Sequence, residues 1–183
     1  MKLASDCGGL VSEMSEPGMR LLAEIVRGRH EGPTILYQAW PARLVPRPRS
    51  SGLIPDTWRY VDWPEPIVGT ASWVQLFRAA GFISIPYGLP QPTSPLTVFR
   101  GTSAERRAAM SWTLDKSRAD QFRQRHSWYA PTAIYRTVVQ PAAVLALLER
   151  RGESPREVVV DPQMIRDIAQ LGPLHPQRYR EGP

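Results

Sequence analysis

The sequence predicts a single α+β domain in which short strands alternate with loops and small helices. The chain has 183 residues, which is one domain's worth of sequence and enough to bury one core. It contains 19 prolines. Because proline interrupts helical hydrogen bonding, long unbroken helices should be few. Short runs rich in β-branched and aromatic residues recur from Leu96 onward, as expected of strands.

Four stretches make up this one domain. The first stretch lacks periodic apolar positions, as a mobile terminus does. From Leu96 onward, short runs of β-branched and aromatic residues predominate. We therefore expect a flexible N-terminal tail over 1–17, a helical and loop part over 18–95, a core with the binding motifs over 96–171 and a C-terminal tail over 172–183.

Apolar residues at helical spacing predict two helices before Leu96. One covers Met19–Arg29. The other covers Ser72–Ala80, where Ser72 is a natural N-cap and Gly81 ends the helix. A short apolar run follows this second helix at 82–85.

Prolines punctuate the segment between the two helices, over 33–66. Such punctuation favours irregular chain. We expect disorder around 47–51 and two short extended pieces, around 35–40 and 58–63.

The core should contain four strands and two or three helical segments. The helix after the second strand should turn Ala119 and Phe122 inward. We predict strands over 96–100, 111–113, 133–139 and 157–160, helices over 115–125 and 142–151, and one or two helical turns over 164–171.

The charge is lopsided, with 23 Lys and Arg against 17 Asp and Glu and a net charge of +6. Only Lys2 and Lys116 are lysines, so arginine dominates. Arginine-rich usage is compatible with codon composition alone, since net charge speaks to solubility and not to fold. It is also compatible with a phosphate-bearing partner, which the guanidinium fork grips in bidentate fashion.

Several classes of protein are disfavoured by the sequence. No apolar run approaches the roughly 20 residues that span a bilayer, and Met1–Gly18 does not read as a secretory signal. A single cysteine, Cys7, excludes an intramolecular disulfide framework. We expect no metal site, because His30, His126 and His175 lack ligand spacing. The expected location is cytoplasmic, in a bacterium or a host cell, with no membrane partner.

Three short motifs follow one another in the second half. A strand carries Phe99-Arg100-Gly101, a second reads Ser111-Trp112-Thr113, and a third begins at Glu157. Each motif is weak when taken alone, since a glutamate at a strand edge is usually a solvated charge.

Together, their order and spacing resemble the ADP-ribosyltransferase family of the Arg-Ser-Glu type, over about 96–162. The matching positions are Arg100, Ser111 with Thr113, and Glu157. The resemblance implies a split mixed β-sheet core with small helices and an N-terminal helical extension. It also implies a bacterial or phage enzyme, a toxin, effector or modifier, that moves ADP-ribose from NAD to a macromolecular target and releases nicotinamide.

The resemblance also assigns roles. Glu157 would be the catalytic carboxylate that stabilises an oxocarbenium-like transition state, and Ser111 would fix its rotamer. Arg100 would grip phosphates, and Gly101 would let backbone approach the nicotinamide amide. We expect Arg100, Ser111 and Glu157 to converge on one cleft, where NAD would also contact Gly101, Trp112, Thr113 and Phe122.

One position departs from the family. Members that modify arginine carry Glu or Gln two residues before the catalytic Glu, where this chain has Pro155. Small arginine analogues such as agmatine should therefore be poor acceptors, because a guanidinium without a carboxylate partner stays protonated. A protein or nucleic-acid acceptor stays open. So do an NAD glycohydrolase, a non-catalytic module on the same fold and, resting on charge alone, a basic nucleic-acid binder.

Overall fold

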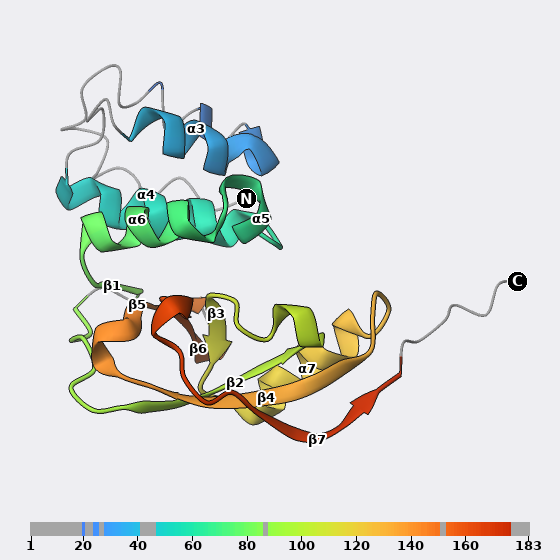
Figure 1. Ribbon diagram of the computed structural model, residues 1–183. Helices are drawn as coiled ribbons and strands as arrows, with labels where there is room; N and C mark the ends of the chain where they lie inside the picture. The colour runs from blue at the N-terminus through green and yellow to red at the C-terminus, as the bar shows by residue number, and fades with distance from the viewer. Residues whose placement is uncertain are drawn as a thin grey trace, which may run out of the picture. The chain divides into compact units, whose positions relative to one another are not determined.

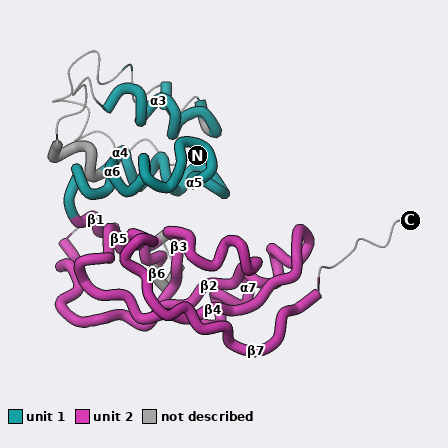
Figure 2. The backbone as a smooth tube through the Cα atoms, in the orientation of Figure 1, with its two compact units in different colours: residues 1–81 teal, residues 82–183 magenta. Residues whose placement is uncertain are grey.

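The computed structural model describes residues 20, 24–25, 28–40, 47–85, 88–150 and 153–176 (Figure 1). The predicted tail over 1–17 and most of the predicted helix over 19–29 lie outside these residues. The chain divides into two compact units, residues 1–81 and 82–183 (Figure 2).

The first unit is helical in its described part. Its interior is an aromatic cluster, in which Trp58 meets Trp73 edge-on at 5.0 Å between ring centroids and Phe77 at 5.6 Å. Trp73 also donates from Nε1 to the Pro64 carbonyl at 2.9 Å. The elements are η1 (Arg29–Glu31), α3 (Gly32–Ala39), α4 (Arg47–Tyr60), α5 (Glu65–Val68) and α6 (Thr70–Ala80).

The extended pieces predicted over 35–40 and 58–63, and the disorder predicted around 47–51, are wrong. The chain is helical up to Ala39 in α3 and from Arg47 to Tyr60 in α4, and residues 61–63 form a bend. In α4, Ile54 and Trp58 lie one helical turn apart and are buried. The burial of this face outweighs the hydrogen bond that Pro55 removes from the helix interior.

The helix predicted over 72–80 is confirmed as α6. It begins two residues earlier, at Thr70, with Gly69 rather than Ser72 at the N-cap. Gly81 ends it as predicted, with φ +82°, a left-handed value that glycine adopts without strain.

The second unit is built on a seven-stranded mixed sheet, which confirms the α+β class. The strand order is β1-β5-β6-β3-β2-β4-β7, with β1 and β5 parallel and every other neighbouring pair antiparallel. The strands are β1 (Ile83–Ile85), β2 (Leu96–Thr102), β3 (Ser111–Thr113), β4 (Thr132–Val139), β5 (Val144–Arg150), β6 (Glu153–Val160) and β7 (Ala169–His175).

One α-helix and three short 3-10 turns accompany the sheet. Helix α7 (Lys116–His126) packs against β2 and β4. The turns are η2 (Ala104–Arg106), η3 (Pro141–Ala143) and η4 (Pro162–Met164). The buried core joins five strands and contains Val98, Trp112, Ala133, Tyr135, Val139, Val144, Leu147, Val158 and Val160.

Two helical predictions in this unit are wrong. The stretch expected to be a helix over 142–151 forms the end of η3 and strand β5 in its described part. The stretch expected to form helical turns over 164–171 contains the last residue of η4, irregular chain over 165–168 and the first three residues of β7. Val144–Leu148 is a continuous apolar run, and such a run does not distinguish a strand from a helix by its periodicity. Pairing with β1 on one side and β6 on the other makes it an interior strand, buried from Val144 to Leu148.

Across the described ranges, none of the helices combines the length and the apolar character that crossing a bilayer requires.

Candidate functional site

The three motif residues lie on three adjacent strands. Strand β3 stands between β2 and β6, so Ser111 has the strand of Arg100 on one side and the strand of Glu157 on the other. Thr113 is the partner of Phe99 in β2 and of Glu157 in β6. Positions 46 residues apart in sequence are thereby brought together.

Hydrogen bonds link all three residues. The Ser111 hydroxyl donates to Glu157 Oε1 at 2.6 Å. The Arg100 guanidinium donates through Nη1 to the Ser111 backbone carbonyl, and through Nε to the Arg106 carbonyl at 3.0 Å. The predicted contact between Ser111 and Glu157 is confirmed, and the Arg100 guanidinium bonds to the backbone carbonyl of the same serine.

Strand register places Arg100 differently from the other two. Side chains alternate between the faces of a sheet, and directly paired residues share a face. Thr113 is paired with both Phe99 and Glu157, so these three side chains lie on one face. Arg100 starts from the other face, opposite Tyr135. Its guanidinium reaches Ser111 because β2 pairs with β3 at Phe99 alone.

Thr113 is buried and serves the start of α7. Its hydroxyl oxygen accepts from the Asp115 N–H at 3.2 Å. Asp115 is the N-cap of the helix and accepts from the Ser117 N–H at 2.6 Å. Hydrogen bonds with the side chain of Ser117 and then with its backbone N–H hold the pKa of the Asp115 carboxyl below its usual value. Thr113 thus joins the strand ladder to the beginning of the helix.

Trp112 does not stand where NAD contact was predicted. It is 2% exposed and belongs to the core cluster, paired with Val158 in β6. Its Nε1 donates to the Ala109 carbonyl at 2.8 Å, which satisfies the indole where it is buried. Alternation along β3 explains the difference, because Trp112 points away from the face that Ser111 and Thr113 occupy.

Gly101 has a packing role that the sequence analysis missed. A Cβ at this position would lie 1.8 Å from the Ala119 carbonyl oxygen and 2.5 Å from the Arg123 nitrogen, both backbone atoms of α7. The space that a side chain would need at this position is therefore taken up by the helix. Only glycine lets α7 lie this near to β2.

Phe122 does not face inward as predicted. Ala119 is fully buried, but Phe122 is 36% exposed. The guanidinium carbon of Arg118 lies 5.2 Å from the centre of its ring, and the His126 ring is 6.2 Å away on the other side. These contacts place Phe122 in a cationic surface row along α7.

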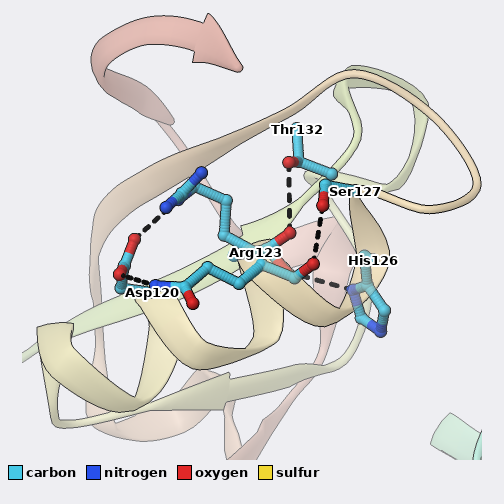
Figure 3. A network of polar contacts seen from close by, with 7 residues as sticks. Asp120, Arg123, His126, Ser127 and Thr132 are labelled. Carbon is cyan, nitrogen blue, oxygen red and sulfur yellow. Dashed lines mark hydrogen bonds and ion pairs between the residues drawn. The ribbon is translucent and has the colours of Figure 1, made fainter. Parts of the chain in front are cut away.

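His126 is a residue that the sequence analysis set aside as a scattered histidine. Its Nδ1 donates to the Gly101 carbonyl, 3.2 Å away, because a carbonyl oxygen can only accept (Figure 3). Burial lowers the pKa of His126 despite this hydrogen bond, and the nearby charges of Arg100, Arg125 and Arg106 lower it further. Its spacing of four residues from Phe122 was the available sequence signal.

Tyr135 carries an unusual buried hydroxyl. The residue is 2% exposed, and among the residues that the structure describes its oxygen has no hydrogen-bond partner. Burial raises its pKa, with Arg107 acting in the opposite direction. An unsatisfied buried hydroxyl is uncommon in folded proteins.

No cluster of three or more His, Cys, Asp or Glu suited to a metal ion occurs within the described ranges. Comparison with known proteins gives no match to a family model, a curated protein or a solved structure.

Proposed function

We propose that this chain is an NAD-dependent mono-ADP-ribosyltransferase with Glu157 as its catalytic carboxylate. The observation that carries the proposal is the 2.6 Å hydrogen bond from Ser111 to Glu157, with the Arg100 guanidinium bonded to the same serine's carbonyl. Three sequence motifs selected for their order and spacing thus form one connected group. The mixed sheet, in which β2 and β3 pair at a single position, is compatible with a split core of this family.

The chemistry needs a fixed negative charge beside the ribose of NAD. When the bond between the ribose C1′ and the nicotinamide nitrogen breaks, its electron pair leaves with nicotinamide and C1′ becomes cationic. The Glu157 carboxylate would stabilise that cation, and the Ser111 hydroxyl holds the carboxylate in place. An acceptor oxygen or nitrogen then bonds to C1′ and gives up its proton.

Pro155 shapes the proposed acceptor. In the family, an acid two residues before the catalytic glutamate accompanies arginine modification, and β6 has proline there. We therefore propose a macromolecular acceptor, a protein or a nucleic acid, other than a simple guanidine.

Nicotinamide release tests the proposal directly. Purified protein is incubated with NAD and agmatine, RNA, DNA or no acceptor. We expect release that Glu157→Gln reduces by about 100-fold or more, because the neutral amide stabilises the cation poorly. Glu149→Gln is the matched control, since Glu149 lies on the neighbouring strand β5.

Three results would contradict parts of this proposal. Release that stays within about twofold in Glu157→Gln excludes Glu157 as the catalytic group. Fast modification of agmatine refutes the argument from Pro155. Equal release in all four reactions identifies an NAD glycohydrolase.

One observation favours a second candidate, a non-catalytic binding module on the same fold. Two backbone carbonyls, those of Arg106 and Ser111, already engage the Arg100 guanidinium, which lends the arginine a structural role. This candidate predicts that the wild-type protein binds NAD, measured by calorimetry, without releasing nicotinamide.

A further inference from the structure

Helix α7 carries cations and aromatic rings in one row, and the turn after it adds two exposed aromatic side chains. Arg118, Phe122, Arg125 and His126 follow at helical spacing, and the Tyr129 N–H donates to the His126 carbonyl at 3.0 Å in the turn directly after the helix. Trp128 is 46% exposed and Tyr129 70% exposed. We name this row the α7 stripe, made of Arg118, Phe122, Arg125, His126, Trp128 and Tyr129.

The stripe is strongly basic. Between Lys116 and His126 the helix has four Lys or Arg residues and a single acid, Asp120. Asp120 forms an ion pair with Arg123 at 2.6 Å. The guanidiniums of Arg100, Arg106 and Arg125 all act on His126, so positive charge from β2 and η2 adds to that of the helix.

Rings and guanidiniums lie against one another along the stripe. Arg118 lies over the face of Phe122 at 5.2 Å, and the Phe122 and His126 rings are inclined by 30° at 6.2 Å. Aromatic faces beside guanidiniums are what bases and phosphates of a single strand contact, by stacking and by charge-assisted hydrogen bonds.

The surface is held in shape by the network in Figure 3. Thr132 donates to the Arg123 carbonyl at 3.1 Å, which ties the end of α7 to β4. Ser127 donates to the Gln124 carbonyl at 2.6 Å, and His126 bonds to Gly101 of β2. A fixed helix end limits the ordering that binding would require of the protein.

We propose that the α7 stripe is a docking surface for single-stranded nucleic acid. Phosphates would contact Arg118 and Arg125, and unstacked bases would lie on Trp128 and Tyr129. A bilayer surface is a poorer match, because an interfacial helix needs a broad apolar face, and the apolar residues of α7 are Phe122 and the buried Ala119. The inference is independent of the proposed enzyme activity, since it needs neither NAD nor turnover.

Binding of a fluorescent 20-nucleotide oligo-dT, followed by anisotropy, tests the inference. We expect the wild-type full-length chain to bind it more tightly than a duplex of equal length, in which bases are not available for stacking. Tyr129→Ala and Trp128→Ala should each weaken binding by about 5- to 100-fold. The matched control is Tyr60→Ala, because Tyr60 is a similarly exposed tyrosine, at 63%, on α4.

Charge is tested separately by salt. Arg125→Gln should reduce the slope of log affinity against log salt concentration by about 0.7, since one phosphate contact is lost. Arg78→Gln makes an equal change of charge at an exposed position of α6 and should leave the slope as in the wild type.

Four results would overturn the inference. They are the absence of oligo-dT binding, equal affinity for the duplex, binding that Tyr129→Ala and Arg125→Gln leave unchanged, and binding only to phosphatidylserine vesicles. Thermal unfolding of each variant, compared with the wild type, separates loss of binding from loss of fold.

Discussion

The two sides of strand β2 are built differently. Along one edge β2 pairs with β4 at seven positions, from Leu96 to Thr102, and α7 packs across the two strands so closely that Gly101 admits no side chain. On the other side it pairs with β3 at Phe99 alone. Arg100 uses the opening on that side to donate to carbonyls of Ser111 and Arg106.

This contrast shows how a rigid ladder can support a polar site next to it. Where the ladder with β4 is complete, the backbone N–H groups of β2 that point toward β4 are engaged in the sheet. Where the pairing with β3 is incomplete, backbone carbonyls are available to accept hydrogen bonds from side chains. The Ser111–Glu157 hydrogen bond forms next to this region, between β3 and β6. Sites are more precise on strands held by their neighbours than on loops.

Breaking the closely packed side should have the largest effect. Gly101→Ala places a Cβ against backbone atoms of α7, at 1.8 Å from the Ala119 oxygen, and backbone cannot rotate away as a side chain can. We expect the free energy of unfolding to fall by about 3 kcal/mol or more. Denaturation by urea, followed by circular dichroism, measures it.

Gly172→Ala provides the comparison. It has φ +81° but no atom within 4 Å of an added Cβ, so it should cost only about 1–2 kcal/mol of backbone strain. Equal losses in the two variants would show that the contact between α7 and β2 does not depend on glycine.

Disturbing the open side should have the next largest effect. Ser111→Ala removes the donor at 2.6 Å from Glu157, so the carboxylate gains rotamer freedom. If the proposed activity holds, nicotinamide release should fall about 10-fold in kcat with little change in KM, as expected of a positioning residue.

Ser111→Thr keeps a hydroxyl on the strand and should restore most of the rate. In the double variant with Glu157→Gln, the loss should match that of Glu157→Gln alone, because the serine acts through the carboxylate. Additive losses would mean that Ser111 acts separately.

Three strands around the site could be predicted because their sequences are locally decisive, whereas β6 begins at Glu153, four residues before its predicted start at 157. β3 has its predicted bounds, and β2 and β4 begin or end within two residues of them, since β-branched and aromatic residues dominate these runs. β5 could not be predicted, because it is a strand only by virtue of pairing with β1 on one side and β6 on the other. That pairing arises in the folded protein and leaves no periodic signal in the apolar sequence of β5. Helix α4 was not predicted for a related reason, because the stabilisation from burying one face of the helix exceeds the cost of the proline inside it.

The site was predictable where two strands share one face. Ser111 and Glu157 meet as the order of motifs indicates. Trp112 could have been corrected from sequence, since it alternates with two residues assigned to the site. Phe122 could not, because α7 packs on β2 with the backbone of Ala119 and Arg123 against Gly101, and this orientation leaves the phenyl ring partly exposed.

A smaller effect concerns Tyr135, which stands opposite Arg100 on the fully paired side. An unsatisfied buried hydroxyl costs about 1–3 kcal/mol. Tyr135→Phe keeps the ring and should therefore raise the free energy of unfolding by about 1 kcal/mol. A variant that is less stable than the wild type would show that the hydroxyl has a hydrogen-bond partner in solution.

The smallest effect should be a change in pH dependence at His126, where the α7 side and the Arg100 side of β2 meet. Burial, and then the charges of Arg100, Arg125 and Arg106, lower its pKa below 6.5 in the folded protein. As pH falls through about 6.5, the unfolded chain takes up a proton on this histidine before the folded chain does, so stability is lost in this range. Above that pH the histidine is neutral in both states, and it does not change the free energy of unfolding as pH varies.

We expect His126→Gln to lose less stability than the wild type between pH 7.5 and 5.5, measured by urea denaturation at each pH. Carboxylates with lowered pKa, such as those of Asp115 and Asp120, lose their contribution at lower pH and equally in both proteins. Parallel curves for the two proteins would mean that the guanidiniums around His126 do not disfavour its protonated form.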